Sequence, residues 1–156
     1  MLHASALPAP TKGLARTILG IWKLKTRVDI DASGQRRIDP ILGVDPLGIL
    51  CIAPGYFAAQ FMKRDRSTPA NLQEPFRGKN NSMAVDGYDA YFGTYIVDEG
   101  AGTFTTYLEG SIAASNIGST FVRDIRVLGN ELIIQLPTTA VDGTAVTRTL
   151  TFSRVG

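Results

Sequence analysis

From Ile21 to the end of the chain, short runs of residues that favour β-strands follow one another at close intervals. The runs are rich in Ile, Val, Tyr, Phe and Thr, and clusters of Gly, Asp, Asn and Pro separate them. Pairs such as Gly129-Asn130 and Asp142-Gly143 favour tight turns between neighbouring strands. Many short strands at near-regular spacing predict an antiparallel sandwich or barrel. The candidate strands are residues 20–29, 35–41, 47–53, 56–62, 89–98, 103–111, 119–128, 131–137 and 145–154.

The composition is that of one folded domain. Of 156 residues, 44% are hydrophobic and 19% are charged, which argues against a disordered chain. The formal net charge of +2 is too small to indicate a nucleic-acid partner. No apolar stretch reaches the roughly 18 residues that a membrane span needs, and residues 1–15 show no signal-peptide pattern. We therefore expect a cytoplasmic protein that binds neither nucleic acid nor membrane.

One cysteine and one histidine leave few groups for metal or nucleophilic chemistry. Cys51 alone rules out an internal disulfide and a metal site built from several cysteines. His3 lies in a predicted tail, which argues against histidine-based triads and histidine-ligated metals. The sequence also contains no glycine-rich phosphate loop. We expect no metal and no cofactor.

The chain divides into a short lead and one β-domain. Residues 1–17 are predicted to form a flexible lead with a short helix, whose turn falls within residues 12–20 and ends at Gly20. Residues 18–156 form the predicted barrel. Residues 63–88 break the strand rhythm and predict a long loop that lies like a lid at one end. The basic residues that begin this loop either guide an anionic ligand to the barrel or are simply solvated.

The chain resembles a known family in several motifs that occur in order. Gly20-Ile21-Trp22 resembles the Gly-x-Trp opening strand of the lipocalin superfamily. The resemblance covers roughly residues 18–155 and implies an antiparallel lipocalin-like β-barrel of about eight to nine strands, a size that can hold one small ligand. The segments that resemble the small lipocalin-like domain proteins of bacteria and fungi are Asp45–Leu50, Gly55–Met62, Tyr88–Asp98, Leu108–Ser111, Val122-Arg123 and Leu150–Arg154.

The first and last strands of such a barrel predict a structural contact. The guanidinium of Arg154 can stack on the indole of Trp22 at the closed end, a cation–π contact worth about 1–2 kcal/mol when partly desolvated. The alternative for Trp22 is a platform for the ligand. The sequence also departs from the family at Thr106, near which relatives often carry a histidine. Any acid–base role of that histidine does not carry over to this chain.

Four residues are candidates for chemistry inside the barrel. Glu109, if it faces the interior, would have a raised pKa and could move a proton near neutral pH. Tyr95 and Tyr107 could donate a hydrogen bond that polarises a carbonyl group, or could pack as ordinary strand aromatics. Arg123 could bind a carboxylate or enolate. Alternatively, Glu109 faces water, or Arg123 forms a salt bridge with Glu109 or Asp124. A one-residue slip in register would reverse all of these orientations.

A wider set of residues is predicted to contact the ligand. Aromatic and hydroxyl side chains at alternating strand positions suit an interior that is apolar with a few polar groups. Gln60 could orient a ligand oxygen or face solvent. The predicted ligand-binding residues are Phe57, Gln60, Tyr91, Phe104, Thr106 and Phe121.

Two functions are compatible with a barrel of this kind. In the first, the barrel binds a small, largely apolar or amphipathic molecule and promotes its cyclisation or isomerisation without a cofactor, in a natural-product (polyketide- or terpenoid-like) pathway. In the second, the barrel only carries or sequesters its ligand. Strand faces that are apolar on both sides are compatible with a homodimer.

Overall fold

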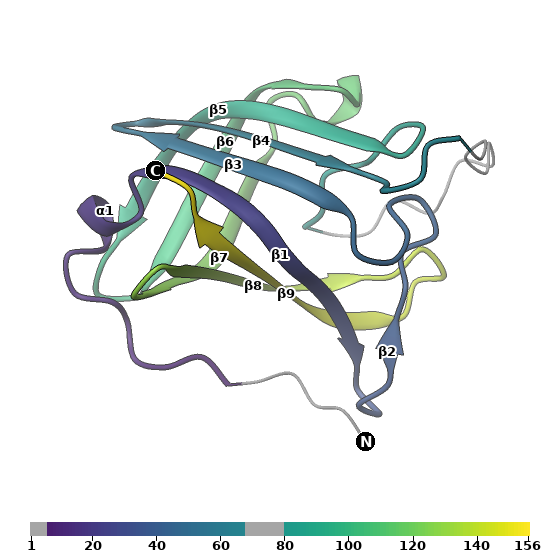
Figure 1. The fold of residues 1–156 in the computed structure, drawn as a ribbon, viewed down its shortest axis with the longest axis horizontal. Helices are drawn as coiled ribbons and strands as arrows, with labels where there is room; N and C mark the ends of the chain where they lie inside the picture. Colours follow the sequence, from purple (N-terminus) through teal and green to yellow (C-terminus); the bar gives the residue numbers. More distant parts are fainter. Residues whose placement is uncertain (1–5, 68–79) are drawn as a thin grey trace.

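The computed structural model describes residues 6–67 and 80–156, and most of its regular structure is β-strand (Figure 1). The short helix α1 (Leu14–Thr17) precedes the strands, and the 3-10 turn η1 (Ala114–Asn116) lies between two of them. The described residues form the strands β1 (Gly20–Asp31), β2 (Arg36–Arg37), β3 (Leu47–Ala53), β4 (Tyr56–Met62), β5 (Tyr88–Asp98), β6 (Thr103–Ser111), β7 (Thr120–Leu128), β8 (Glu131–Thr139) and β9 (Ala145–Arg154).

Eight of these strands close into an antiparallel barrel, and β2 lies outside it against β1. Each strand from β3 to β9 pairs with the next, and β9 pairs back with β1. The length of β1 makes closure possible, because Gly20–Lys23 pair with β3 whereas Trp22–Asp31 pair with β9. Closure leaves no unpaired edge around the barrel. The predicted antiparallel β-barrel is confirmed.

The structure differs from the sequence prediction at one strand, agrees with the short helix, and leaves part of the predicted lid untested. The strand expected over residues 35–41 is reduced to Arg36–Arg37, because the chain turns at Pro40 and the Asp39 carboxylate accepts a hydrogen bond from the Ile41 N–H at 2.8 Å. The helix is limited to one turn. The central part of the predicted lid, residues 68–79, lies outside the described residues. Neither helix in the described part of the chain is both long and apolar enough to cross a membrane.

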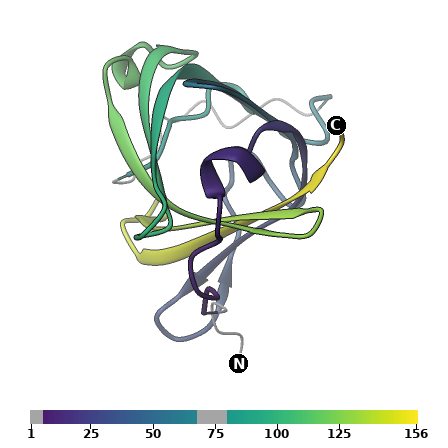
Figure 2. The same ribbon diagram turned by 90° about the vertical axis from the view of Figure 1, so that its left-hand side faces the viewer.

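The lead to the barrel covers one of its ends (Figure 2). Leu14 and Ile18 are fully buried in the core beneath α1. The stacking predicted between Arg154 and Trp22 is present there, with the guanidinium carbon 4.1 Å from the centre of the indole ring. Trp22 also donates a hydrogen bond from Nε1 to the Ile18 carbonyl at 2.8 Å, and Arg154 donates to the Leu19 carbonyl at 2.9 Å. These contacts tie the first and last strands to the lead and seal this end.

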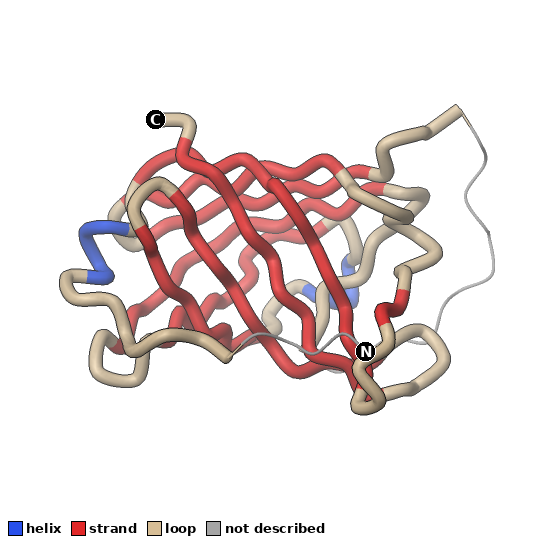
Figure 3. The backbone as a smooth tube through the Cα atoms, turned by 60° about the horizontal axis from the view of Figure 1, so that its bottom comes forward, coloured by secondary structure: helices blue, strands red, loops and turns tan. Residues whose placement is uncertain are grey.

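The strands run from the end sealed by α1 to the end that carries the longer loops (Figure 3). Two β-bulges along them change which side chains face inward. The pairing of β1 with β9 skips Lys25, and the pairing of β6 with β5 skips Glu109. An extra residue shifts the in–out alternation by one position. In β1 this places Arg27 and Asp29 on the inner side, continuing from Trp22.

Gly93 lies opposite the bulge in β6, where the two backbones approach closely. A Cβ atom added at Gly93 would lie 1.8 Å from the Tyr107 carbonyl oxygen and 2.9 Å from the Glu109 amide nitrogen. Because both contacts are with backbone atoms, the strands would have to move apart. We expect Gly93→Ala to lower the free energy of unfolding by about 3 kcal/mol, at the upper end of typical overpacking costs. Urea denaturation measures this change.

Gly100→Ala is the matched control for this prediction. An added Cβ atom at Gly100 would lie 3.5 Å from the Asp98 side chain, an ordinary contact. We expect this exposed substitution to change stability by no more than about 0.5 kcal/mol. Equal stability of the two variants would show that the close approach at Gly93 relaxes without cost.

Candidate functional site

A cavity of about 60 Å³ lies inside the barrel. Its apolar part is formed mainly by inward-facing phenylalanine rings, because alternate residues of a strand face the barrel interior. The Phe57 ring contacts those of Tyr91 and Phe104 edge-on, with centroids 6.0 Å apart in each case. The rings that line this part are those of Phe57, Phe61, Phe104, Phe121 and Phe152.

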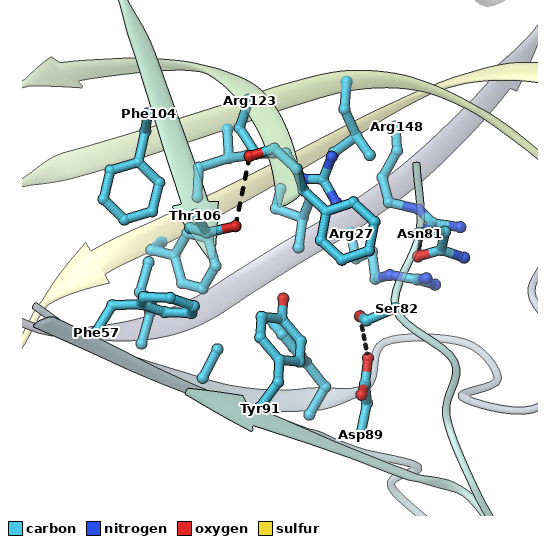
Figure 4. A pocket seen from close by; sticks show the side chains of 18 of the residues that line it. Arg27, Phe57, Asn81, Ser82, Asp89, Tyr91, Phe104, Thr106, Arg123 and Arg148 are labelled. Atoms are coloured by element: carbon cyan, nitrogen blue, oxygen red, sulfur yellow. Dashed lines mark hydrogen bonds between the residues drawn. The ribbon is translucent and has the colours of Figure 1, made fainter. Parts of the chain in front are cut away.

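Charged and polar side chains gather at one end of the cavity (Figure 4). In this view Phe57 and Phe104 lie at the other end. The bulge in β1 brings Arg27 inward, and Arg148 shares the inner face of β9 with Leu150 and Phe152. The remaining polar lining includes Asn81, Ser82, Asp89, Tyr91, Thr106 and Arg123.

Two of the arginines at this end are paired with buried carboxylates. Arg148 binds Asp29 through two hydrogen bonds, from Nε at 2.8 Å and from Nη2 at 3.0 Å, and its Nη1 donates to Asn81 at 2.7 Å. Arg27 forms an ion pair with Asp39 at 3.2 Å. Burial and the nearby positive charge of Arg148 lower the pKa of Arg27, but it remains protonated at neutral pH. Both pairs are therefore charged and fixed in position.

Arg123 has a different environment from the other two. Its guanidinium donates hydrogen bonds to the Asn80 amide oxygen and to the Val122 carbonyl, and it lies 4.8 Å from the centre of the Phe121 ring. Among the described residues it forms no ion pair with a carboxylate. Burial lowers the pKa of Arg123 to about 10, so it stays charged at neutral pH, and the described residues supply no counter-ion for it.

Asp89 is a buried carboxylate with one oxygen that lacks a hydrogen-bond partner among the described residues. Its side chain is 4% exposed. Its Oδ2 accepts a hydrogen bond from the Ser82 hydroxyl at 2.6 Å, while its Oδ1 has no hydrogen-bond partner. Burial raises the pKa of Asp89, although the Ser82 hydrogen bond and the charges of Arg27 and Arg148 act in the opposite direction. A carboxyl group with a raised pKa and an available oxygen can exchange a proton with a bound molecule.

Tyr91 adds a hydrogen-bond donor beside Asp89. Its hydroxyl points into the cavity (Figure 4). Burial and the negative charge of Asp89 raise the pKa of Tyr91 to about 12. The phenol is therefore protonated at neutral pH and can donate a hydrogen bond to an oxygen atom in the cavity.

The structure brings part of the predicted site together. The predicted residues that line the cavity are Phe57, Tyr91, Phe104, Thr106, Phe121 and Arg123. Thr106 is 5% exposed, and its hydroxyl is directed to the Phe121 carbonyl at 3.4 Å. Arg123 forms no salt bridge with Glu109 or Asp124, so neither of the salt bridges considered from the sequence is present. The remaining predicted residues lie elsewhere.

The predicted interior positions of Glu109, Tyr107 and Gln60 are wrong. Glu109 is the extra residue of the β6 bulge and is exposed. Tyr107 is 49% exposed, and Gln60 is exposed on β4, where its amide oxygen accepts a hydrogen bond from the Tyr88 hydroxyl. Each of these side chains lies outside the cavity. Tyr107 and Glu109 share the face of β6 opposite to that of Phe104 and Thr106, so the two sets could not both line the cavity.

Tyr95 also lies outside the cavity, for a different reason. Its ring packs against the Phe104 ring with centroids 4.7 Å apart, and its hydroxyl donates to the Ala53 carbonyl at 2.8 Å. The hydroxyl is thus engaged at the turn between β3 and β4. The sequence predicted that this hydroxyl faces the barrel interior, and that prediction is wrong.

Apart from Arg123, the charged residues of the site and two of its polar residues were not found from the sequence. The sequence pattern could have placed Arg148 in the barrel, because it alternates with buried apolar residues on one face of the last strand. These residues are Val146, Leu150 and Phe152. No sequence pattern could have placed Arg27 in the barrel, because its inward position depends on the bulge at Lys25, which the local sequence does not show. The residues missed in this way are Arg27, Asp29, Asp39, Asn81, Ser82, Asp89 and Arg148.

The described residues contain no cluster of histidine, cysteine, aspartate or glutamate that could hold a metal ion.

A family model described as a lipocalin-like domain matches residues 19–155. No curated protein matches the chain. The matched region includes every strand of the barrel, from the first residue of β1 to the last residue of β9. A closed barrel of this type, with a cavity inside it, indicates binding of a small molecule.

Proposed function

The chain belongs to the lipocalin-like domain family, and we propose that it binds a small, largely apolar molecule inside the barrel and promotes a cofactor-independent isomerisation or cyclisation of that molecule. The observation that carries the proposal is Asp89, a buried carboxylate whose Oδ1 has no partner and which lines a mainly apolar cavity. Leaving such a group unsatisfied costs about 1–3 kcal/mol or more. A bound molecule that exchanges a proton with this oxygen accounts for its retention.

The residues of the cavity suit a proton shift within one molecule. Asp89 accepts a proton from a carbon next to a carbonyl group and returns it to a second atom of the same molecule, so that no other reactant is needed. The Tyr91 hydroxyl donates a hydrogen bond to the carbonyl oxygen, where negative charge develops. Arg123 anchors a further oxygen-bearing group, and the phenylalanine rings hold the apolar part in a reactive conformation. In these roles Asp89 and Tyr91 replace Glu109, Tyr95 and Tyr107.

A non-catalytic carrier or sequestering protein is the alternative. The ion pairs of Arg27 and Arg148 favour this alternative. Both arginines are held in place by carboxylates of the protein, so they can shape a binding cavity without taking part in a reaction. In this function Asp89 and Tyr91 would only contact the ligand. The two functions differ in whether the bound molecule leaves the barrel chemically changed.

Mass spectrometry with chromatographic separation distinguishes the two functions. The pure protein is incubated with small-molecule extracts of the source organism, beside a sample without protein and a sample of the Glu109→Gln variant. We expect a compound of unchanged mass and shifted retention time with the wild-type protein. The Glu109→Gln variant should give the same compound, because Glu109 lies outside the cavity. A compound that co-purifies and is released unaltered would instead establish a carrier and overturn catalysis.

A further inference from the structure

The charges at the polar end of the cavity do not balance. Asp39 pairs with Arg27 at 3.2 Å, and Asp29 pairs with Arg148 at 2.8 Å. Arg123 lines the same cavity and has only neutral hydrogen-bond partners among the described residues. Arg123 is half-buried, and a guanidinium withdrawn in part from water is unfavourable without a counter-ion. The cavity therefore carries one positive charge that the pairs around it leave uncompensated.

Asp89 does not supply the missing negative charge. Its carboxyl group is held by Ser82, and the positive charges that act on it are those of Arg27 and Arg148. Among the described residues, Asp89 forms neither an ion pair nor a hydrogen bond with Arg123. No carboxylate of the described residues therefore compensates Arg123, and a bound anion can take this role.

We propose that the ligand is a small apolar monocarboxylic acid whose carboxylate binds Arg123, an inference that rests on the proposed function of the same cavity. A guanidinium and a carboxylate form two parallel hydrogen bonds, the strongest of the common charge-assisted contacts. The phenylalanine rings beyond Arg123 receive the hydrocarbon part of the acid. A second carboxylate is disfavoured, because it would lie among these rings or beside the carboxylates of Asp29 and Asp39.

The volume of the cavity limits the size of this acid. About 60 Å³ is enough for a few water molecules or a short hydrocarbon segment, but not for a large fused-ring compound. The suitable acids are therefore small short-chain or single-ring monocarboxylic acids.

Isothermal titration calorimetry at neutral pH tests the inference with matched pairs of probes. The probes are straight-chain and single-ring carboxylates of the sizes above, from hexanoate to phenylacetate, and the primary amide of each. The amide keeps the shape of the acid and removes its charge. We expect the best acid to bind at least about tenfold more tightly than its amide.

Two variants locate the binding charge. Arg123→Met removes the guanidinium and keeps most of the side-chain volume, and we expect it to abolish the preference for the acid over its amide. Arg16→Met removes an exposed arginine of α1 and is the matched control, which should keep the preference. Should Arg123→Met fail to fold, the Arg123→Lys variant keeps the charge but not the two parallel bonds, and it should weaken the preference.

The outcomes separate the two proposals. Equal binding of acids and amides, or an unchanged preference in Arg123→Met, would overturn the carboxylate inference and leave ligand binding in the barrel intact. Binding of neither acids nor amides by the wild-type protein would overturn the inference and also remove support for the proposed function. A preference for acids over amides that is lost in Arg123→Met and kept in Arg16→Met supports both the carboxylate inference and the proposed function.

Discussion

Replacing Asp29 with alanine is expected to lower the free energy of unfolding by about 3–5 kcal/mol, the range observed when one partner of a buried ion pair is removed. Asp29 is 4% exposed and holds Arg148 through two hydrogen bonds. Without this carboxylate, Arg27 and Arg148 would be buried together with only Asp39 to offset their charge. Urea denaturation at neutral pH measures the loss.

Two further variants test the cause of this loss. Glu131→Ala removes one partner of the exposed pair between Lys25 and Glu131 and should change stability by no more than about 1 kcal/mol. The double variant Asp29→Ala/Arg148→Met removes both charges of the buried pair and should recover part of the stability. If Asp29→Ala were as stable as Glu131→Ala, Asp29 could not be the group that compensates the arginines.

The Asp29 pair also predicts how stability depends on pH. Burial alone would raise the pKa of Asp29, but the hydrogen bonds and charge of Arg148, together with the charge of Arg27, lower the pKa below its ordinary value of 3.8. A carboxyl group with a lowered pKa in the folded state stabilises the protein above its unfolded-state pKa. This contribution is lost as the pH falls through the folded-state pKa, so the difference between wild type and Asp29→Ala should shrink in acid.

Replacing Asp89 with asparagine is expected to have opposite effects on activity and stability. Turnover of the compound identified in the extract experiment should fall by about 10²–10⁴-fold, the usual contribution of a positioned general base. The amide oxygen can still accept the hydrogen bond from Ser82, so the local structure should be kept. The variant should also be more stable than wild type at neutral pH, because burial disfavours the charged form of Asp89 and asparagine carries no charge.

The stability effect of Asp89 has a pH dependence opposite to that of Asp29. Burial raises the pKa of Asp89, so the folded protein favours its neutral form. The wild-type protein loses stability as the pH rises from the unfolded-state pKa, ordinarily 3.8, to the raised folded-state value. The advantage of Asp89→Asn should therefore vanish in acid and grow as the pH rises above the unfolded-state pKa. Unchanged turnover in this variant, with Glu109→Gln also fully active, would exclude Asp89 as the proton acceptor.

Much of the candidate site could be predicted where the strand alternation is regular. Phe104 and Thr106 alternate on one face of β6, and Phe121 and Arg123 do so on β7, and all of them line the cavity. The prediction failed at Tyr107 and Glu109, which alternate on the outer face of the same strand. Alternation separates the two faces of a strand but does not say which of them faces the barrel interior.

The sequence by itself determined the repeated strands, the turns between them and the closure of the barrel by its first and last strands, because these follow from local propensity and alternation. Only the tertiary structure decided the chemistry of the cavity. Asp29 and Arg148 are 119 positions apart in the sequence, and their contact depends on the pairing of β1 with β9. The bulge at Lys25 then turns Arg27 and Asp29 inward. Long-range pairing, which no local pattern encodes, therefore placed an uncompensated Arg123 and a half-satisfied Asp89 in one cavity.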